Sequence, residues 1–187
     1  NHGDASFSEP TGHVSVDYRL DDQSTVYARL SHGYRSGGFN VRTLQPAFDP
    51  EFIDQFEIGL KTDLLDERLR LNGAGYTSRY EDQQISRFGV DLNGGAATAI
   101  DNAGKSQYDG FELEVTALLT DSLTFTASTA FNDVEIQEVE DANGNDIADL
   151  YEVANTPEKT AQASLVYAHP LDGIGELNAR VDWKYED

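Results

Sequence analysis

Apolar and polar side chains alternate strictly in the segment Phe111-Glu-Leu-Glu-Val-Thr-Ala117. Successive side chains of a β-strand point to opposite faces of a sheet. A period of two therefore puts Phe111, Leu113 and Val115 on one face, and Glu112 and Glu114 on the other. The segment is predicted to be a strand with one apolar and one polar face.

The same alternation recurs along the chain and predicts about eight strands. An eighth segment, residues 69–80, is less regular, because Gly73 and Gly75 take the apolar positions while Tyr76 and Tyr80 fall on the other side, and we expect a β-bulge there. The apolar members of the other six segments are Val14, Val16, Tyr18 and Leu20; Val26, Ala28 and Leu30; Phe56, Ile58 and Leu60; Leu123, Phe125 and Ala127; Ala161, Ala163, Leu165 and Tyr167; and Leu177, Ala179, Val181, Trp183 and Tyr185.

The connections between these segments alternate between short and long. Short turns are expected at residues 21–24, 65–68, 120–122 and 172–175, and long polar loops at residues 34–52, 81–106 and 133–160. Strands of roughly ten residues that are joined alternately by short turns and long loops are typical of outer-membrane barrels. The predicted fold is all-β, an antiparallel up-and-down meander of about eight long strands.

Composition agrees with this class and excludes others. Mean hydropathy is −0.52, and no apolar run approaches the roughly 18 residues of a membrane helix, whereas a transmembrane strand needs only about 9–11. The 13 basic against 34 acidic residues give a net charge of −21, which argues against a nucleic-acid partner. With no cysteine, no phosphate-binding loop and no nucleophile elbow, we expect no enzyme, no cofactor and no metal centre.

Aromatic residues near the strand ends are placed where interfacial girdles would lie. They are Tyr18, Tyr34, Tyr108, Tyr167, Trp183 and Tyr185.

The stretch Val26-Tyr-Ala-Arg-Leu-Ser-His-Gly-Tyr-Arg-Ser-Gly-Gly-Phe-Asn40 closely resembles a barrel strand and loop entry of TonB-dependent outer-membrane receptors. The resemblance covers most of the chain, from about Phe7 to about Tyr167. The motifs that follow in the same order as in that family are Asp49-Pro-Glu51, Phe56-Glu-Ile-Gly-Leu-Lys61, Leu69-Arg-Leu-Asn72, Asn102-Ala-Gly-Lys105 and Tyr108-Asp-Gly-Phe-Glu-Leu-Glu114.

The resemblance implies a barrel of about 22 strands around a folded plug in the Gram-negative outer membrane. It also implies capture of a ferric siderophore or similar scarce ligand, with energy supplied by TonB through an N-terminal box. The sequence contains no plug and no TonB box, and it ends at Asp187 without the aromatic residue of a closing strand. We therefore expect residues 1–187 to be a partial barrel domain, a middle-to-late arc of the wall. Its expected partners are outer-membrane lipid, the TonB complex through the absent plug and box, and a small-molecule ligand.

The first long loop carries the candidate ligand-binding residues. Aromatic and basic groups cluster there, and they could recognise an anionic, aromatic iron chelate through stacking and charge, although Gly37 and Gly38 would also suit a simple turn. The candidates are Tyr34, Arg35, Phe39, Asn40 and Arg42. The polar residues expected to line the lumen are Arg29, Glu57, Lys61, Glu112 and Glu114.

Residues 141–152 place oxygen-bearing side chains at positions 1, 3, 5, 9 and 12 of a calcium-loop pattern. Asp146 stands at position six, where the pattern requires glycine, so a solvated acidic loop is favoured. Two other architectures remain open from the sequence: a complete eight-stranded outer-membrane barrel, and a soluble acidic β-sandwich that binds a ligand.

Overall fold

The computed structural model describes residues 6–41, 43, 45–90, 93–102, 104–139, 145–150 and 156–187. No helix within these residues is long and apolar enough to cross a membrane. The elements are β1 (Gly12–Arg19), β2 (Ser24–Arg35), β3 (Glu51–Leu64), β4 (Leu69–Glu81), β5 (Gln84–Val90), β6 (Ala96–Asn102), β7 (Gly104–Thr120), β8 (Leu123–Val139), the 3-10 helix η1 (Ala148–Leu150), β9 (Lys159–Leu171) and β10 (Gly175–Glu186).

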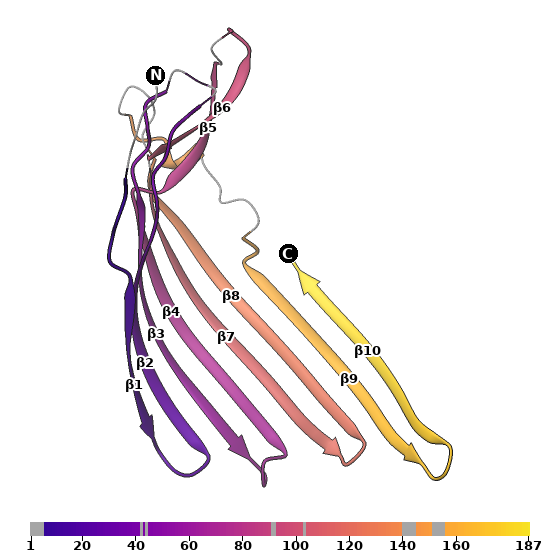
Figure 1. Cartoon of the computed structure of the whole chain (residues 1–187). Helices are drawn as coiled ribbons and strands as arrows, with labels where there is room; N and C mark the ends of the chain where they lie inside the picture. The colour runs from indigo at the N-terminus through magenta and orange to yellow at the C-terminus, as the bar shows by residue number, and fades with distance from the viewer. Residues whose placement is uncertain are drawn as a thin grey trace.

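Eight of the strands form one antiparallel sheet in the order β1-β2-β3-β4-β7-β8-β9-β10, and β5 and β6 form a separate two-stranded sheet. The strands of the large sheet run from 8 to 17 residues, and the predicted meander is confirmed. Figure 1 shows the sheet as a single curved layer, with β1 and β10 at opposite edges. Neither the closed eight-stranded barrel nor the two-layered sandwich matches this arrangement of the described strands.

Cross-strand pairing confirms the predicted division into two faces. Val26 lies opposite Leu60, Leu60 opposite Gly73, and Gly73 opposite Leu113, so the apolar members of neighbouring strands share one face. We call it the apolar face, and the other the polar face. Large hydrophobic side chains on the apolar face remain exposed, for example Val14 at 70%. The sheet therefore presents its apolar face without a second protein layer over it among the described residues.

The fourth strand differs from the prediction in one respect. The register of β4 with both β3 and β7 runs without interruption, so the expected bulge within residues 69–80 is absent, and the prediction was wrong. The irregularities lie instead between β7 and β8. A close approach calls for glycine at a neighbouring position instead: the ring of Tyr76, on the polar face, covers Gly110 of β7, and a Cβ on Gly110 would lie 2.8 Å from Cε1 of Tyr76.

Two of the predicted long loops contain strand structure. Residues 81–106 include the β5–β6 hairpin, and β8 continues to Val139, so that it takes up the first seven residues of the predicted loop 133–160. The end of the sheet that carries these long connections is called here the long-loop rim; it lies at the top of Figure 1. The predicted loop 34–52 is confirmed apart from its ends, because β2 ends at Arg35 and β3 begins at Glu51.

The polarity of the two faces reverses near the long-loop rim. Phe111 of β7 and Phe131 of β8 are cross-strand partners on the apolar face, and the next pair on that face toward the rim is Asp109 and Asp133. On the opposite face, Val134 is paired with Tyr108. Tyr108 therefore does not belong to a girdle on the apolar face, and its prediction as a girdle residue was wrong; its ring lies 5.1 Å from that of Tyr80.

Candidate ligand-binding site

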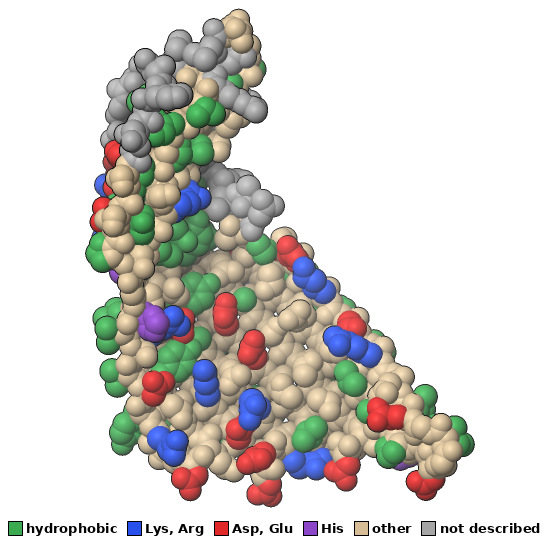
Figure 2. All heavy atoms as spheres, viewed as in Figure 1, with side chains coloured by type: hydrophobic (Ala, Val, Ile, Leu, Met, Phe, Trp, Pro, Cys, Tyr) green, Lys and Arg blue, Asp and Glu red, His purple; other side chains and the backbone are tan. Residues whose placement is uncertain are grey.

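The polar face of β2, β3, β4 and β7 carries charged side chains in register. Arg29 lies opposite Glu57 in the ladder between β2 and β3, and Tyr27 donates a hydrogen bond of 2.7 Å to Glu57 Oε1. Lys61 Nζ lies 5.4 Å from the centroid of the Tyr27 ring. In Figure 2, Lys, Arg, Asp and Glu side chains are scattered over the part of the sheet that faces the viewer.

Glu112 and Glu114 lie on the same face, so the structure brings together all five residues that the sequence predicted to line a lumen. Glu112 is opposite Ala74 and Ala130, while Glu114 is opposite Asn72 and Ser128. This surface offers hydrogen-bond donors and acceptors, and charged groups of both signs, to whatever occupies the concave side of a barrel wall.

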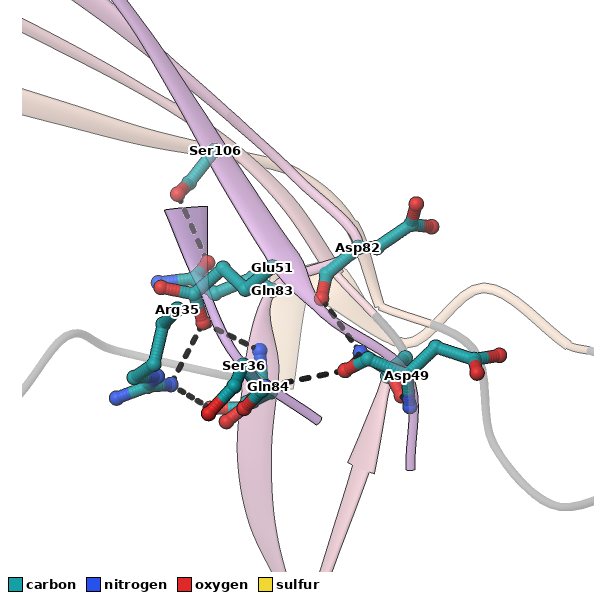
Figure 3. A network of polar contacts seen from close by, with 9 residues as sticks. Arg35, Ser36, Asp49, Glu51, Asp82, Gln83, Gln84 and Ser106 are labelled. Atoms are coloured by element: carbon teal, nitrogen blue, oxygen red, sulfur yellow. Dashed lines mark hydrogen bonds and ion pairs between the residues drawn. The ribbon is translucent and has the colours of Figure 1, made fainter. Parts of the chain in front are cut away.

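At the long-loop rim the polar face ends in an ion pair between Arg35 and Glu51. Arg35 Nη2 lies 2.6 Å from Glu51 Oε2, and the backbone amide of Gln84 donates to the same oxygen at 2.6 Å. Arg35 Nη2 also donates to the Gln84 carbonyl oxygen at 3.3 Å. Figure 3 shows Arg35, Glu51 and Gln84 meeting at this point, where β2, β3 and β5 come together.

The two members of this pair differ in exposure. The side chain of Glu51 is only 10% exposed, whereas that of Arg35 is 59% exposed. A buried carboxylate is stabilised when charged and backbone donors surround it, as they do here. Glu51 thus fixes one edge of the guanidinium group, while the rest of the Arg35 side chain remains accessible to solvent.

The described residues between 36 and 50, which connect β2 to β3, fold back on themselves. Gly38 and Phe48 exchange two backbone hydrogen bonds of 2.9 Å, forming an isolated antiparallel bridge. A Cβ on Gly38 would lie 2.8 Å from Cζ of Phe48, and one on Gly37 would lie 2.9 Å from the carbonyl carbon of Asp49. Neither glycine has a positive φ, so close packing rather than a tight turn explains the pair.

Three amide side chains join residues 36–50 to the β5–β6 hairpin. Asn40 and Ile100 are linked by two hydrogen bonds of 2.8 Å, from Nδ2 to the carbonyl oxygen and from the backbone amide to Oδ1. Asn102 is linked to the backbone of Asp49 in the same two-way manner, at 2.8 Å and 2.5 Å. Gln84 Nε2 donates to the carbonyl oxygens of Asp49 and Ser36 at 3.0 Å and 3.1 Å.

The sequence did not predict the participation of Gln84, Asn102 or Glu51. Their partners lie 16 to 53 residues away in the chain, and most of these partners are backbone atoms, which no sequence pattern identifies. A weaker signal existed for Asn102, which stands in the motif Asn102-Ala-Gly-Lys105 that resembles the receptor family.

Of the five predicted ligand-binding residues, Arg42 lies outside the described residues. Arg35 lies on the polar face at the rim, while Tyr34, its neighbour in β2, points to the opposite face and is paired with Phe52. Phe39 is 43% exposed. The amide of Asn40 is engaged by Ile100 and also donates to the Pro46 carbonyl oxygen at 2.9 Å. The structure thus brings Arg35 and Asn40 to the same hairpin and leaves Tyr34 on the other face.

Most of the calcium-pattern segment 141–152 lies outside the described residues. Asp146 is described, and its Oδ1 accepts hydrogen bonds from the backbone amides of Ala148 at 3.0 Å and Val139 at 3.2 Å. These bonds lower the pKa of Asp146 below its ordinary value of 3.8. Within the described part of the chain, no group of three or more His, Asp or Glu side chains is arranged to hold a metal ion.

An open meander of long strands, with one apolar face and one polar face, defines the wall of an outer-membrane β-barrel. The model of the family described as TonB dependent receptor-like, beta-barrel, matches residues 1–187. The chain belongs to this family, and membership places it in the outer membrane of Gram-negative bacteria.

Relatives and solved structures agree with the family. The chain is 30% identical over 128 residues to the probable TonB-dependent siderophore receptor PiuA of Acinetobacter baumannii, covering 68% of this chain and 16% of that protein. It is 26% identical over 157 residues to the metal-pseudopaline receptor CntO of Pseudomonas aeruginosa, covering 84% and 20%. The crystal structure of the ferric yersiniabactin uptake receptor FyuA from Yersinia pestis matches with a TM-score of 0.71 at 23% identity, over 93% of this chain and 25% of that one, which shows the fold alone. The chain thus spans a quarter or less of each of these proteins.

Proposed function

We propose that this chain is an arc of the wall of a receptor that takes up a scarce nutrient, such as a ferric siderophore, across the outer membrane. The apolar face contacts outer-membrane lipid, and the polar face lines the lumen. Residues 1–187 form a partial barrel domain, and the plug, the TonB box and the remaining strands belong to other parts of the receptor. The TonB complex acts through that plug and box. The wall binds and passes its ligand and makes no covalent bond, so it is not an enzyme.

The observation that carries this proposal is the exposed guanidinium group of Arg35. It lies on the polar face at the long-loop rim, where a ligand would enter, and Glu51 and the Gln84 carbonyl oxygen fix its direction. A positive group is notable in a chain with a net charge of −21. Charge-assisted hydrogen bonds from guanidinium to an anionic oxygen are shorter and stronger than neutral ones, so Arg35 suits an oxygen-rich anionic chelate.

Phe39 supplies an exposed aromatic surface on the loop that begins directly after Arg35. Aromatic rings stack on planar ligand groups and bury a large area at a small loss of side-chain freedom. We propose Arg35 and Phe39 as ligand contacts. Arg42 is proposed as a further contact on sequence grounds alone, whereas Tyr34 lies on the other face of the wall and is left out of the proposed site.

The test is ligand binding to the purified full-length receptor. Ferric complexes of a catecholate, a hydroxamate and a carboxylate siderophore are titrated, and radioactive iron uptake is measured in cells. We expect at least one complex to bind, and Arg35→Ala to weaken its binding about 10-fold or more, since a hydrogen bond to a charged group contributes about 1.5–3 kcal/mol. Arg35→Lys should retain the charge but lose part of the affinity, because lysine cannot form a bidentate pair of hydrogen bonds with the ligand.

Arg79→Ala is the matched control. Arg79 lies in β4 near the same rim but on the opposite face, with Nε 3.4 Å from Glu81 Oε1, and its side chain is 58% exposed, almost the same as that of Arg35. We expect this variant to bind the ligand as the unmodified receptor does. Equal losses for the two variants, or no binding of any ferric complex, would overturn the proposal.

A further inference from the structure

The β5–β6 hairpin does not belong to the large sheet. Its two strands of seven residues pair only with each other among the described strands. An isolated two-stranded hairpin is marginally stable in water at best. Contacts beyond its own ladder must therefore hold it in place above the rim, where it stands in Figure 1.

We propose that Asn40 is a positioning residue: it fixes the β5–β6 hairpin to residues 36–50, so that the two segments act as one ligand-capturing arm. Asn40 presents a donor and an acceptor to the backbone of Ile100 in the geometry of a peptide group, and so replaces one pair of ladder hydrogen bonds on β6. This proposal rests on the proposed receptor function and gives Asn40 a role through the hairpin instead of direct ligand contact.

A second amide makes the same connection in the opposite direction. Asn102 of β6 is bonded through its side chain to the backbone of Asp49, and its Nδ2 also donates to the Asp82 carbonyl oxygen at 2.9 Å. The loop therefore contributes a side chain to the hairpin backbone, and the hairpin contributes one to the loop backbone. Such reciprocal pairing leaves neither segment free to move without breaking bonds to the other.

The arm is joined to the proposed ligand contact at its base. Gln84, the first residue of β5, donates its backbone amide to Glu51 and accepts from Arg35, and its side chain holds Ser36 and Asp49. A displacement of β5 would consequently remove a partner from Arg35 and release one of the two donors to Glu51. The position of the Arg35 guanidinium group thus depends on the hairpin, and the hairpin depends on Asn40.

The experiment replaces Asn40 with Asp in the full-length receptor. Asp is nearly isosteric, retains one acceptor for the Ile100 amide, and places a carboxylate instead of a donor against the Ile100 carbonyl oxygen. Hydrogen exchange of peptides that cover residues 36–50 and 84–102 is followed by mass spectrometry. We expect exchange in both segments to rise about 10-fold or more, with β3, β4 and β7 unchanged. Asn102→Asp should produce the same pattern, because it breaks the same arm from the other side.

Asn178→Asp is the control for the change of charge. Asn178 lies on exposed β10, where its Nδ2 donates to Glu176 Oε1 at 2.7 Å, far from the arm in the sheet order. It should leave exchange of both arm segments unaltered. In acid, the protonated carboxyl of the Asn40→Asp variant again offers a donor and an acceptor, so its exchange relative to the unmodified receptor at the same pH should recover. A role in general stability alone would not show this local recovery.

Binding separates the positioning role from direct contact. With whichever ferric complex binds the unmodified receptor, Asn40→Asp and Asn102→Asp should weaken affinity to a similar degree, and the double variant should be little worse than either single one. Unchanged exchange in residues 84–102 would overturn the inference, as would loss of affinity in the Asn40 variant alone. The exchange measurement needs no ligand, so failure of every ferric complex to bind would overturn the receptor proposal and leave the arm to be judged by exchange.

Discussion

Replacing Leu113 by Arg tests which medium covers the apolar face. Leu113 lies four residues from Asp109 along β7, and Asp109 is the first charged residue of that face toward the long-loop rim. A tilted strand advances about 2.6 Å per residue along the membrane normal, which puts Leu113 about 10 Å below that boundary. The apolar band of such a barrel is about 25 Å tall, so Leu113 lies near its midplane.

Arginine at the midplane destabilises an outer-membrane barrel by about 2–4 kcal/mol. We therefore expect Leu113→Arg to shift the unfolding equilibrium of the full-length receptor by a factor of about 30 to 900. The measurement is urea unfolding of the receptor refolded into phospholipid vesicles, monitored by tryptophan fluorescence and by gel mobility.

Ala130→Arg is the matched control at almost the same depth. Ala130 lies opposite Glu112 on the polar face, so the new guanidinium group meets a carboxylate in water, and the change should stay within about 1 kcal/mol. If the two variants lose equal stability, or if the Ala130 variant loses more, the assignment of lipid to the apolar face is refuted.

The other predictions concern packing and a loop turn. Gly110→Ala should lower stability by about 1–3 kcal/mol in thermal unfolding, because the new Cβ would displace the Tyr76 ring. Gly73→Ala should be nearly neutral, since the nearest atoms would lie 3.9 Å from its Cβ. Equal effects of the two substitutions would contradict this packing. The amides of Ala148 and Val139 bind the carboxylate of Asp146 more strongly than its protonated form, which is why the pKa of Asp146 is depressed, so the turn should be at full strength above pH 3.8 and weaken as pH falls below that value. Hydrogen exchange of these two amides measures the weakening of the turn. The variant Asp146→Asn should abolish the dependence of this exchange on pH. An unchanged pH response in the variant would contradict the role of the Asp146 carboxylate.

The alternation of side chains predicted the large sheet because it is a local property. A strand such as β7 needs only its own sequence to place Leu113 and Glu112 on opposite faces, and pairing with β4 and β8 then follows from chain order. The facing of β4 was harder to predict, because Gly73 lies on the apolar face but has no side chain whose hydropathy would indicate that face.

The far part of β8 was missed although its sequence still alternates. Val134 and Ile136 alternate with Asp133 and Glu135, but the apolar pair lies on the face that is polar further down the strand. Beyond the hydrocarbon layer, water covers the outside of the wall, so charged residues move to that face. The alternation thus continues with its two faces exchanged, and the charges of this part of β8 resemble those of a polar loop.

The arm could not be predicted from local pattern. Residues 93–100 read Asn-Gly-Gly-Ala-Ala-Thr-Ala-Ile and carry no alternation. Pairing of β5 with β6 is supported by Asn40 from a distant loop, at a separation of 60 residues from Ile100. The clustering of aromatic and basic groups in the first long loop identified Arg35 and Asn40 as candidates, but only the structure shows which backbone atoms each of them contacts.

Odd and even positions of one strand should meet different media, lipid and water, and a nitroxide scan of residues 111–117 tests this most directly. Single labels are placed at each position of the full-length receptor in lipid bilayers, and their relaxation by oxygen and by a water-soluble nickel complex is compared. Labels at 111, 113, 115 and 117 should respond chiefly to oxygen, and those at 112, 114 and 116 chiefly to nickel. A response that does not alternate with a period of two, or one that alternates with the opposite phase, would contradict the account.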